Sequence, residues 1–483
     1  MTSSTRLTAL FLGSGASVEV GMPLVGELTE ELKQWLTPDK LRDLNVGWRM
    51  QGTGYPDTVI EDFATVLACK PMHYESLLGY LETQSRRVLP LLQQYHGLYS
   101  WLVEMVYHIF RLRHTNNIAL IDQNLSSFEG IAKLAHANAP LWIFSLNHDV
   151  VIECLAAKYD IPLHSGFSSG LIALPRRDAS GTKIGELRAE TLSEAQLAKG
   201  IVFAQPGVAG INLLKIHGAL DVFAYRDGKD FAKLVPDERT VQSIIDMLRI
   251  AQDELLYVDP QRPYPVKATN EIAFADEMGV MQFLRRSLVA GTHKFDNRHG
   301  QVLPKEFFKQ FESDINFVST LICIGYGFGD LHINRVLCDW LERTPDRRLE
   351  IVSPGASIPA FLLHLSPQVA VFTEAASDYL DRTTGIVRSR REISQRRLGA
   401  WFRKNRKDPQ VQQKFLIFIQ ERQDASFRDL LEQMRRRYPE GGGVESETVD
   451  GIPVNCAKQL AEVNELSFDT LVEEFLGTQS SGL

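Results

Sequence analysis

The chain has 483 residues, of which 44% are hydrophobic and 23% charged, and its formal net charge at pH 7 is -8. This length predicts two or three domains, and the composition is typical of a soluble globular protein. The negative balance disfavours a protein that wraps nucleic acid over much of its surface, and no apolar run approaches the roughly 18 residues that span a bilayer.

The chain start and the cysteines bear on the cellular compartment. Residues 1–6 precede a short strand rather than the apolar stretch of a signal peptide. No Cys-x-x-Cys pair exists, so neither a zinc ribbon nor a redox dithiol is available. We expect buried, reduced thiols in a cytoplasmic protein. The five cysteines are Cys69, Cys154, Cys323, Cys338 and Cys456.

The first predicted strand, 10–12, is followed by the loop Gly13-Ser14-Gly15-Ala16-Ser17. Two glycines let the backbone turn sharply and approach a ligand, and a helix is expected to open near Ser17. A strand, a glycine turn and a helix N-terminus together predict a cradle for a diphosphate. The full dinucleotide motif needs a third glycine where the chain has Val18, which disfavours a plain dehydrogenase. An ordinary strand-to-helix turn stays an alternative.

Further apolar runs predict five more strands along the chain, at 141–145, 213–216, 320–324, 349–353 and 369–372. Residues 24–46 have helical spacing broken at Pro38, and 59–136 have a helical pattern without a strand. Short helices are expected at 150–159 and 332–342, and a second helix-rich insertion at about 236–312. Beyond 375 the pattern is helical, with a flexible joint at Pro439–Ser446 and a last helix near 468–476.

Alternating strands and helices predict an α/β fold, a Rossmann-like doubly wound parallel sheet of about six strands. We expect one domain at 1–375, containing both helical insertions, and a helical C-terminal region at 376–483 that contacts partners or other copies. Ligands bind outside the carboxyl ends of the strands in such sheets. Polar clusters follow the first five strands, so these ends are the predicted site.

Four strand-end motifs stand in a characteristic order: Gly13-Ser-Gly-Ala-Ser17 with Gly21-Met-Pro23, Ser145-Leu-Asn-His-Asp149, Lys215-Ile-His-Gly218, and Gly325-Tyr-Gly-Phe-Gly-Asp330. Over roughly residues 7–375 the chain resembles the sirtuin-like NAD-hydrolysing domain of bacterial anti-phage defence proteins. That branch typically has Thr-Thr-Asn-Tyr-Asp, Lys-x-His-Gly and Gly-Tyr-Ser-Phe-x-Asp at the last three motifs. This chain departs from it at Ser145-Leu146 and at Gly327, where a phosphate-binding hydroxyl is lost.

The resemblance implies an NAD glycohydrolase that cleaves NAD to nicotinamide and ADP-ribose and depletes cellular NAD in abortive infection. NAD would be the substrate, with no metal. Asn147 and His217 would be the catalytic pair. An uncharged amide can hold the ribose hydroxyls and a water, and an imidazole with a pKa near ~6.5 can accept a proton. The implied NAD-binding positions are Gly13, Ser14, Gly15, Ala16, Ser17, Met22, Pro23, Asp149, Gly325, Tyr326, Gly327 and Ser353, with Asp149 near the carboxamide and Ser353 near the adenosine ribose.

Some of these residues also have purely structural interpretations. Asp149 would equally serve as a helix cap, Asn147 as a turn residue, and Gly329 with Asp330 as a turn and cap. We expect His148 to pack or face solvent and His332 to be a surface residue at a helix start. The carboxylates, such as Asp57 and Glu61 with Asp62, show no spacing that indicates a metal or an acid/base pair.

Two other functions stay open. A non-catalytic NAD- or ADP-ribose-binding assembly module is favoured by the missing hydroxyl at Gly327. An NAD-dependent protein deacylase is disfavoured because the chain lacks the four-cysteine zinc module of deacetylating sirtuins.

The resemblance implies that the chain forms a homo-oligomer. It also implies a protein partner, which would be a translocase ATPase, a short Argonaute or a sensor subunit. The stretch Arg382–Lys407 holds ten basic residues with Trp401 and Phe402 among them. We interpret it as a solvated helix face rather than a nucleic-acid surface. The partner, the trigger, the oligomeric state, the preference for NAD over NADP and the role of 376–483 stay open.

Overall fold

The first unit of the chain contains a parallel sheet and ends later than the sequence predicts. The computed structural model describes residues 7–261, 264–288, 303, 305–437, 448–449, 452–453 and 468–480. It divides into two units, Met1–Gly385 and Ile386–Leu483. The boundary falls after Gly385 rather than after 375, because α13 (Ala376–Thr384) packs on α7 (Glu129–Ala137) inside the first unit.

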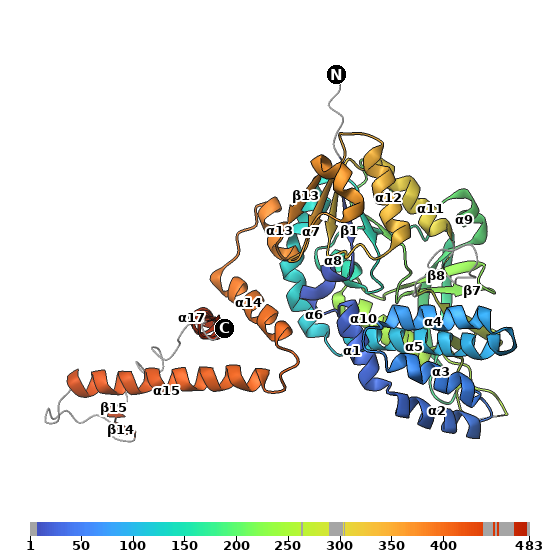
Figure 1. The fold of residues 1–483 in the computed structure, drawn as a ribbon, viewed down its shortest axis with the longest axis horizontal. Helices are drawn as coiled ribbons and strands as arrows, with labels where there is room; N and C mark the ends of the chain where they lie inside the picture. The colour runs from blue at the N-terminus through green and yellow to red at the C-terminus, as the bar shows by residue number, and fades with distance from the viewer. Residues whose placement is uncertain are drawn as a thin grey trace. The chain divides into compact units, whose positions relative to one another are not determined.

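A seven-stranded sheet, parallel throughout, organises the first unit (Figure 1). Its spatial order is β13-β12-β11-β1-β2-β6-β3. The strands are β1 (Thr8–Leu12), β2 (Leu141–Ser145), β3 (Leu163–His164), β6 (Ile211–Lys215), β11 (Thr320–Ile324), β12 (Arg348–Val352) and β13 (Val369–Phe372). The six predicted strands are confirmed, and the additional β3 is a two-residue edge strand without an apolar run.

The chain builds this sheet outward from β1 in both directions. It goes first through β2, β6 and β3, then returns to add β11, β12 and β13 on the other side of β1. The strand order therefore reverses between β1 and β11, and ligands of doubly wound sheets bind at the crevice that such a reversal opens.

Alternate residues of each strand enter two different cores. Leu10 and Leu12 belong to one hydrophobic cluster, and Ala9 and Phe11 to the other. The Leu10 cluster includes side chains of helices α1–α8, α10 and α13, whereas the Phe11 cluster includes those of α9, α11, α12 and the 3-10 helix η5 (Ala360–Gln368). Side chains bury both faces of the sheet, as a parallel sheet requires.

Helices between β1 and β2 form the predicted insertion, and the described residues 59–136 contain no strand. Helices α4 and α5 pack along each other, as do α2 and α3 (Figure 1). The helices of this region are α1 (Val25–Trp35), α2 (Pro38–Met50), α3 (Asp57–Leu67), α4 (Tyr74–Arg87), α5 (Leu92–Thr115), α6 (Ile118–Leu125) and α7. The α-helix expected near Ser17 begins only at Val25. A 3-10 helix, η1 (Ser14–Val20), comes first and ends at Gly21, whose φ is 107°.

The prediction that 236–312 is helical is wrong in part. Helices α10 (Val241–Glu254) and α11 (Lys305–Asp314) are present, but two strands lie between them, and 289–302 and 304 lie outside the described residues. These strands belong to an antiparallel sheet with the order β4-β5-β8-β7-β10-β9, which the sequence analysis missed. Its strands are β4 (Gly170–Arg177), β5 (Lys183–Leu192), β7 (Val222–Tyr225), β8 (Asp230–Val235), β9 (Glu271–Ala275) and β10 (Met281–Arg286).

Three more helices flank the strands of the first unit. They are α8 (Val151–Lys158), α9 (Glu194–Lys199) and α12 (Leu331–Glu342). Helices α8 and α12 confirm the predictions for 150–159 and 332–342. Each follows a strand of the parallel sheet, so each has its N-terminus at the edge where that strand ends.

The second unit has an aromatic core of its own. It contains α14 (Arg390–Lys404), α15 (Val411–Arg437), α17 (Phe468–Ser480) and a short pairing of β14 (Thr448–Val449) with β15 (Ile452–Pro453). The ring centroids of Trp401 and Phe475 lie 4.7 Å apart, and those of Phe402 and Phe415 lie 5.7 Å apart. Trp401 and Phe402 therefore pack against this unit's own helices. Residues 439–446 lie outside the described part of the chain.

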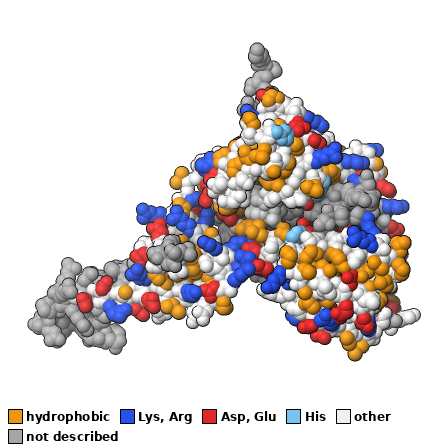
Figure 2. All heavy atoms as spheres, in the orientation of Figure 1, with side chains coloured by type: hydrophobic (Ala, Val, Ile, Leu, Met, Phe, Trp, Pro, Cys, Tyr) orange, Lys and Arg blue, Asp and Glu red, His pale blue; other side chains and the backbone are white. Residues whose placement is uncertain are grey.

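Two further sequence expectations can be compared with the structure. Cys154 and Cys323 are buried, but Cys69 is exposed and Cys338 half-buried, so the expectation of buried thiols is wrong for these two, and Cys456 lies outside the described residues. No helix in the described ranges has the length and apolar character that crossing a membrane requires. Figure 2 shows basic and acidic side chains mixed over the visible face of the first unit.

Candidate active site

A cavity of about 790 Å³ opens at the carboxyl ends of β1, β2, β6 and β11. Its volume lies within the roughly 300–1,000 Å³ of ligand sites, and its place is the reversal of strand order. No Lys or Arg is among the described residues that line it, whereas Glu75, Asp149 and Asp330 are. The wall therefore favours a ligand that carries positive charge.

Nine of the predicted site residues line this one cavity, including the proposed catalytic pair. They are Gly13, Ser14, Met22, Pro23, Asn147, Asp149, His217, Tyr326 and Gly327. The other five, Gly15, Ala16, Ser17, Gly325 and Ser353, are not part of its wall. Ser353 directly follows β12 and donates its N–H at 3.1 Å to the backbone oxygen of Phe372, the last residue of β13.

Gly15 and Gly325 join two loops to each other. A Cβ on Gly15 would lie 2.7 Å from Gly325 Cα, and one on Gly325 would lie 2.3 Å from Ala16 N. Gly325 also has a φ of +63°, which L side chains rarely adopt. These glycines let the loops after β1 and β11 pack closely against each other. Their role is therefore structural, because neither residue lines the cavity.

Ser14 is the residue of the first glycine loop best placed to donate to a ligand. The N–H groups of Gly13, Gly15 and Ala16 donate within the protein, to Ile324 O, Gly325 O and Gly13 O respectively. Ser14 lines the cavity. The loop thus offers a diphosphate mainly this one residue, rather than the full row of N–H groups that the motif predicts.

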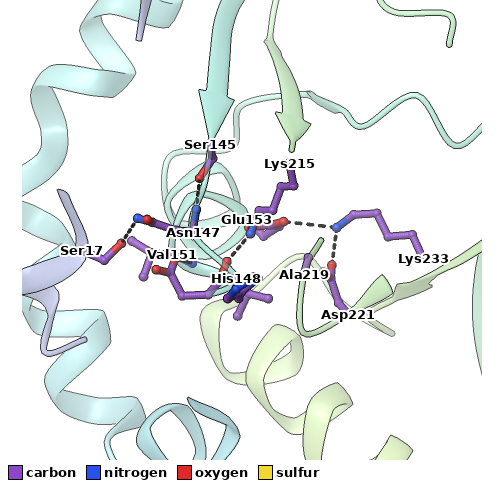
Figure 3. Close-up of polar contacts among 12 residues, drawn as sticks. Ser17, Ser145, Asn147, His148, Val151, Glu153, Lys215, Ala219, Asp221 and Lys233 are labelled. Atoms are coloured by element: carbon purple, nitrogen blue, oxygen red, sulfur yellow. Dashed lines mark hydrogen bonds and ion pairs between the residues drawn. The ribbon is translucent and has the colours of Figure 1, made fainter. Parts of the chain in front are cut away.

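Asn147 is held rigidly at the end of β2. Its Nδ2 donates to Gly13 O at 3.0 Å and to Ser17 Oγ at 3.1 Å, and its backbone N donates to Ser145 Oγ at 3.1 Å. Asn147 is 9% exposed. Figure 3 shows its contacts with Ser17 and Ser145. Because both Nδ2 hydrogens are used, the group that this amide offers a ligand is the acceptor Oδ1.

The next residues, 148–150, are fixed from two sides. Asp149 accepts the N–H of Val151 on Oδ1 at 3.1 Å and still lines the cavity, so it serves the helix start and the wall together. His148 packs on Phe110 as expected, yet it also lines the cavity. His114 is fully buried: its Nε2 accepts the N–H of Val150 at 3.3 Å and its Nδ1 donates to Phe110 O at 2.8 Å. Burial lowers the pKa of His114 below 6.5, so this neutral tautomer persists at neutral pH.

A buried chain of charges ties β6 to this loop (Figure 3). Lys215 donates its Nζ to the backbone oxygen of Asp149 and pairs with Glu153 Oε2 at 3.2 Å. Glu153 also pairs with Lys233 at 3.2 Å, and Lys233 with Asp221. Burial opposes the charge on Glu153, but Lys215 and Lys233 outweigh it and lower the pKa of its carboxyl. Burial likewise opposes the charge on Lys233, whereas Asp221 and Glu153 raise its pKa. Two cations and two anions balance, as burial demands.

His217 follows β6 and is 3% exposed on the cavity wall. The next residue, Gly218, has a φ of +81°, and a Cβ there would lie 2.1 Å from the backbone oxygen of Ser287. Ser287 Oγ bonds both the N–H and the C=O of Ala219, each at 3.3 Å. The end of β10, in the unpredicted antiparallel sheet, thus fixes the turn that presents His217.

Across the cavity from β6, the loop after β11 brings two more side chains to His217. His332 Nε2 lies 3.3 Å from His217 Nε2. A carboxylate oxygen of Asp330 lies within 4.8 Å of a ring nitrogen of each histidine. The expectation that His332 is an ordinary surface residue is wrong, because it is half-buried on the cavity wall. The Tyr326 hydroxyl donates to Asp330 O at 3.2 Å and Asn334 Oδ1 at 3.1 Å, and it accepts the Asp330 N–H. Burial raises the pKa of Tyr326, so this hydroxyl stays a donor.

The helical insertion supplies lining residues that the sequence analysis did not identify. His73, Tyr74 and Glu75 come from the start of α4, and Phe110 comes from α5. Their signal in the sequence is helical spacing alone, and this spacing does not show which helix N-terminus faces the sheet edge.

Comparisons with known protein families and with curated proteins find no match to this chain. The geometry of the cavity is therefore the basis on which a function can be argued.

Proposed function

We propose that the chain is an NAD glycohydrolase that cleaves NAD to nicotinamide and ADP-ribose. One observation carries the proposal: Asn147 and His217, from the ends of the neighbouring strands β2 and β6, line the same cavity as the glycine loop after β1. An acceptor amide, an imidazole and a glycine turn at a reversal of strand order are the groups that hydrolysis of a dinucleotide at its ribose needs.

The chemistry needs little from the protein beyond position and charge. The nicotinamide of NAD is positively charged and leaves as a neutral base when the electron pair of the ribose C1–N bond moves to it. The sugar becomes oxocarbenium-like, and the acidic wall with Glu75, Asp149 and Asp330 stabilises that positive charge. Asn147 Oδ1 accepts from a ribose hydroxyl or the water, and His217 takes the proton that the water releases on attacking C1.

The diphosphate would meet neutral donors. Ser14 offers a hydroxyl at the glycine loop, and Gly327, where relatives by motif have serine, leaves open space, because a Cβ built there meets no atom within 4 Å. We expect this to make ground-state binding of NAD modest without impairing the bond cleavage.

The defence role in this proposal rests on the motif resemblance. An NAD glycohydrolase that is always active would deplete its own cell, so activity needs a switch. We assign contacts with a partner or with other copies to the second unit, which forms its own aromatic core.

The experiment measures turnover of a fluorescent NAD analogue by the purified full chain, alone and with proteins encoded beside it. Asn147→Ala and His217→Ala should each lower kcat by about 10²–10³-fold, the size expected for an oriented polar group or a general base. Asn116→Ala and His136→Ala change the same residue types at exposed positions and should match wild type.

Three outcomes separate the candidate functions. Binding of NAD without turnover under any condition would support the assembly module instead. Turnover that requires an acyl-lysine peptide would support a deacylase. Equal turnover in wild type, Asn147→Ala and His217→Ala would remove the proposed site.

A further inference from the structure

Three side chains that bind transition metals meet on the cavity wall. They are His217 after β6, and Asp330 and His332 at the start of α12. Their ligand atoms all lie within 4.8 Å of one another. His217 is buried and the other two are half-buried, so the cluster is shielded by protein yet reached from the cavity.

The spacing of the two imidazoles matches a bound zinc ion. Two Zn–N bonds of about 2.0–2.1 Å at a tetrahedral angle hold their nitrogens about 3.3–3.4 Å apart. The two Nε2 atoms are 3.3 Å apart, and the ring centroids are 5.5 Å apart with a tilt of 41°. Both rings therefore present the same nitrogen to each other, at a spacing that two ligands of one zinc ion also have.

The third group, Asp330, is held in place through its backbone. Asp330 is the N-cap residue of α12, but its side chain makes no capping hydrogen bond. The backbone N–H and C=O of Asp330 are instead held by the Tyr326 hydroxyl. Phe308 packs edge-on against His332, with ring centroids 5.3 Å apart, and limits the rotation of that imidazole.

We propose that His217, Asp330 and His332 form a site for a divalent transition-metal ion of the Zn²⁺ class. Two imidazoles and a carboxylate are a three-ligand set, and all three residues line the cavity, from which water could supply a fourth ligand. The absence of Lys and Arg from the described lining residues adds to the attraction for a cation. The rival explanation of the 3.3 Å distance is a proton shared between the two imidazoles.

A consequence for activity follows, and it rests on the proposed function. The metal would bind through Nε2 of His217, the atom that faces His332 and that hydrolysis needs as a proton acceptor. An occupied site would therefore be an inhibited enzyme, and removal of the ion would release activity.

The direct test does not depend on NAD. The full chain is stripped with a chelator and titrated with Co²⁺, whose ligand-field absorption in the visible reports tetrahedral coordination. We expect one strongly absorbing ion per chain. His332→Ala and His217→Ala should weaken its binding by more than about 100-fold, above the 10–100-fold loss typical of an outer-shell partner. Asp330→Asn should weaken it less than either histidine variant.

A second group of ligand-type side chains, Cys338, Glu342 and His364, provides the matched control. Binding there would add a sulfur-to-cobalt charge-transfer band, and His364→Ala would lower it. We expect the visible absorption of Co²⁺ bound at the cavity site to be unchanged in His364→Ala. Thermal unfolding of each variant without metal shows whether a lost signal reflects a lost site or a lost fold.

Activity is measured separately, with each variant normalised to its own metal-free rate. Zn²⁺ should inhibit NAD turnover by wild type and His364→Ala, EDTA should restore it, and His332→Ala should need far more Zn²⁺ for the same inhibition. Co²⁺ binding without any NAD turnover would refute the function and keep the metal site. The metal site would be overturned, whatever the turnover, if wild type showed no tetrahedral bands with Co²⁺. It would also be overturned if a folded His332→Ala bound Co²⁺ as tightly as wild type. A proton shared between the two imidazoles would then explain their distance.

Discussion

The two sides of the cavity are built in opposite ways. On the amide side, made of Gly13, Ser17, Asn147, Asp149 and Lys215, hydrogen bonds within the protein hold the amide nitrogen of Asn147, the carboxylate of Asp149 and the ammonium of Lys215. On the imidazole side, made of His217, Asp330 and His332, the side chains face one another across a space that a proton or an ion can occupy.

This difference shows how one cavity can hold a substrate in a fixed position on one side and transfer a proton on the other. In the proposed reaction, a rigid amide would hold the sugar and the water at a set distance, and such orientation is a large part of what a catalytic group contributes. In the same reaction, His217 on the imidazole side would have to take up and release a proton in each cycle. The metal titration tests the imidazole side, and the variants that follow change the amide side, its support and the two glycine loops.

The largest effect is expected at Lys215, on the amide side. Lys215→Met removes one cation from a buried chain that then holds two anions and one cation. Breaking a buried pair in this way costs about 3–5 kcal/mol of unfolding free energy. Denaturant unfolding measures it, and Lys215→Met with Glu153→Gln should recover part of the loss because the charges balance again.

Lys158→Met is the control for that experiment. Lys158 pairs with Asp122 at 2.8 Å, with side-chain exposures of 26% and 52%, and such pairs contribute about 0–1 kcal/mol. If Lys215→Met were no more destabilised than Lys158→Met, the buried chain would not be what holds the amide side.

The amide side and His217 were predictable from the sequence, whereas the pairing of His217 with His332 was not. Apolar runs ending in Gly13–Ser17, Asn147–Asp149 and Lys215–Gly218 mark strand ends, and parallel strands bring their carboxyl ends to one edge. His332 lies two residues inside a helix start, and nothing in its neighbourhood shows that its ring faces a histidine from another strand. Its interpretation as a surface residue followed from local pattern alone.

The antiparallel sheet shows a second limit of the sequence. Strand β5 (Lys183–Leu192) is exposed along much of its first half, so apolar runs do not reveal it. The sheet matters to the site because Ser287, just after β10, holds the turn next to His217. Ser287 and Ala219 are far apart in the chain, and hydrophobic periodicity reveals only the local secondary structure of neighbouring residues. The sequence pattern therefore could not predict this contact.

The next effect in size concerns the pH dependence of stability, through His114. Burial lowers the pKa of His114 in the folded chain below 6.5, so the unfolded chain takes up a proton that the folded chain refuses. Stability should therefore fall as the pH drops below 6.5, by up to about 1.4 kcal/mol per pH unit from this group. Unfolding free energies at pH 7.5 and 5.5 should differ less in His114→Gln than in wild type.

Exposed His136 supplies the matched comparison. His136→Gln should keep the wild-type difference between the two pH values. A His114→Gln protein with an unaltered pH dependence would mean that this histidine is protonated in the fold, and that Val150 N–H is held in another way.

A smaller, kinetic effect separates Ser17 from Ser14. Ser17→Ala removes one of the two acceptors that orient the Asn147 amide, a loss of about 1 kcal/mol that should appear as a fivefold to tenfold lower kcat. Ser14→Ala removes the hydroxyl of a residue that lines the cavity and should instead raise KM with little change in kcat. Steady-state kinetics with NAD distinguish them, and a Ser17→Ala effect on KM alone would show that Ser17 contacts the ligand.

The smallest effect is expected where the chain departs from its motif. A Cβ on Gly327 meets no atom within 4 Å, and this residue lines the cavity, so Gly327→Ser should fold normally and add a donor beside the ligand. KM for NAD should fall about twofold to fivefold, since a neutral hydrogen bond contributes about 0.5–1 kcal/mol. Gly325→Ser is the contrasting variant: its φ of +63° and its contact with Ala16 N forbid a side chain, and its melting temperature should drop sharply. Unchanged KM in Gly327→Ser would mean that the diphosphate lies away from this loop and that Ser14 alone receives it.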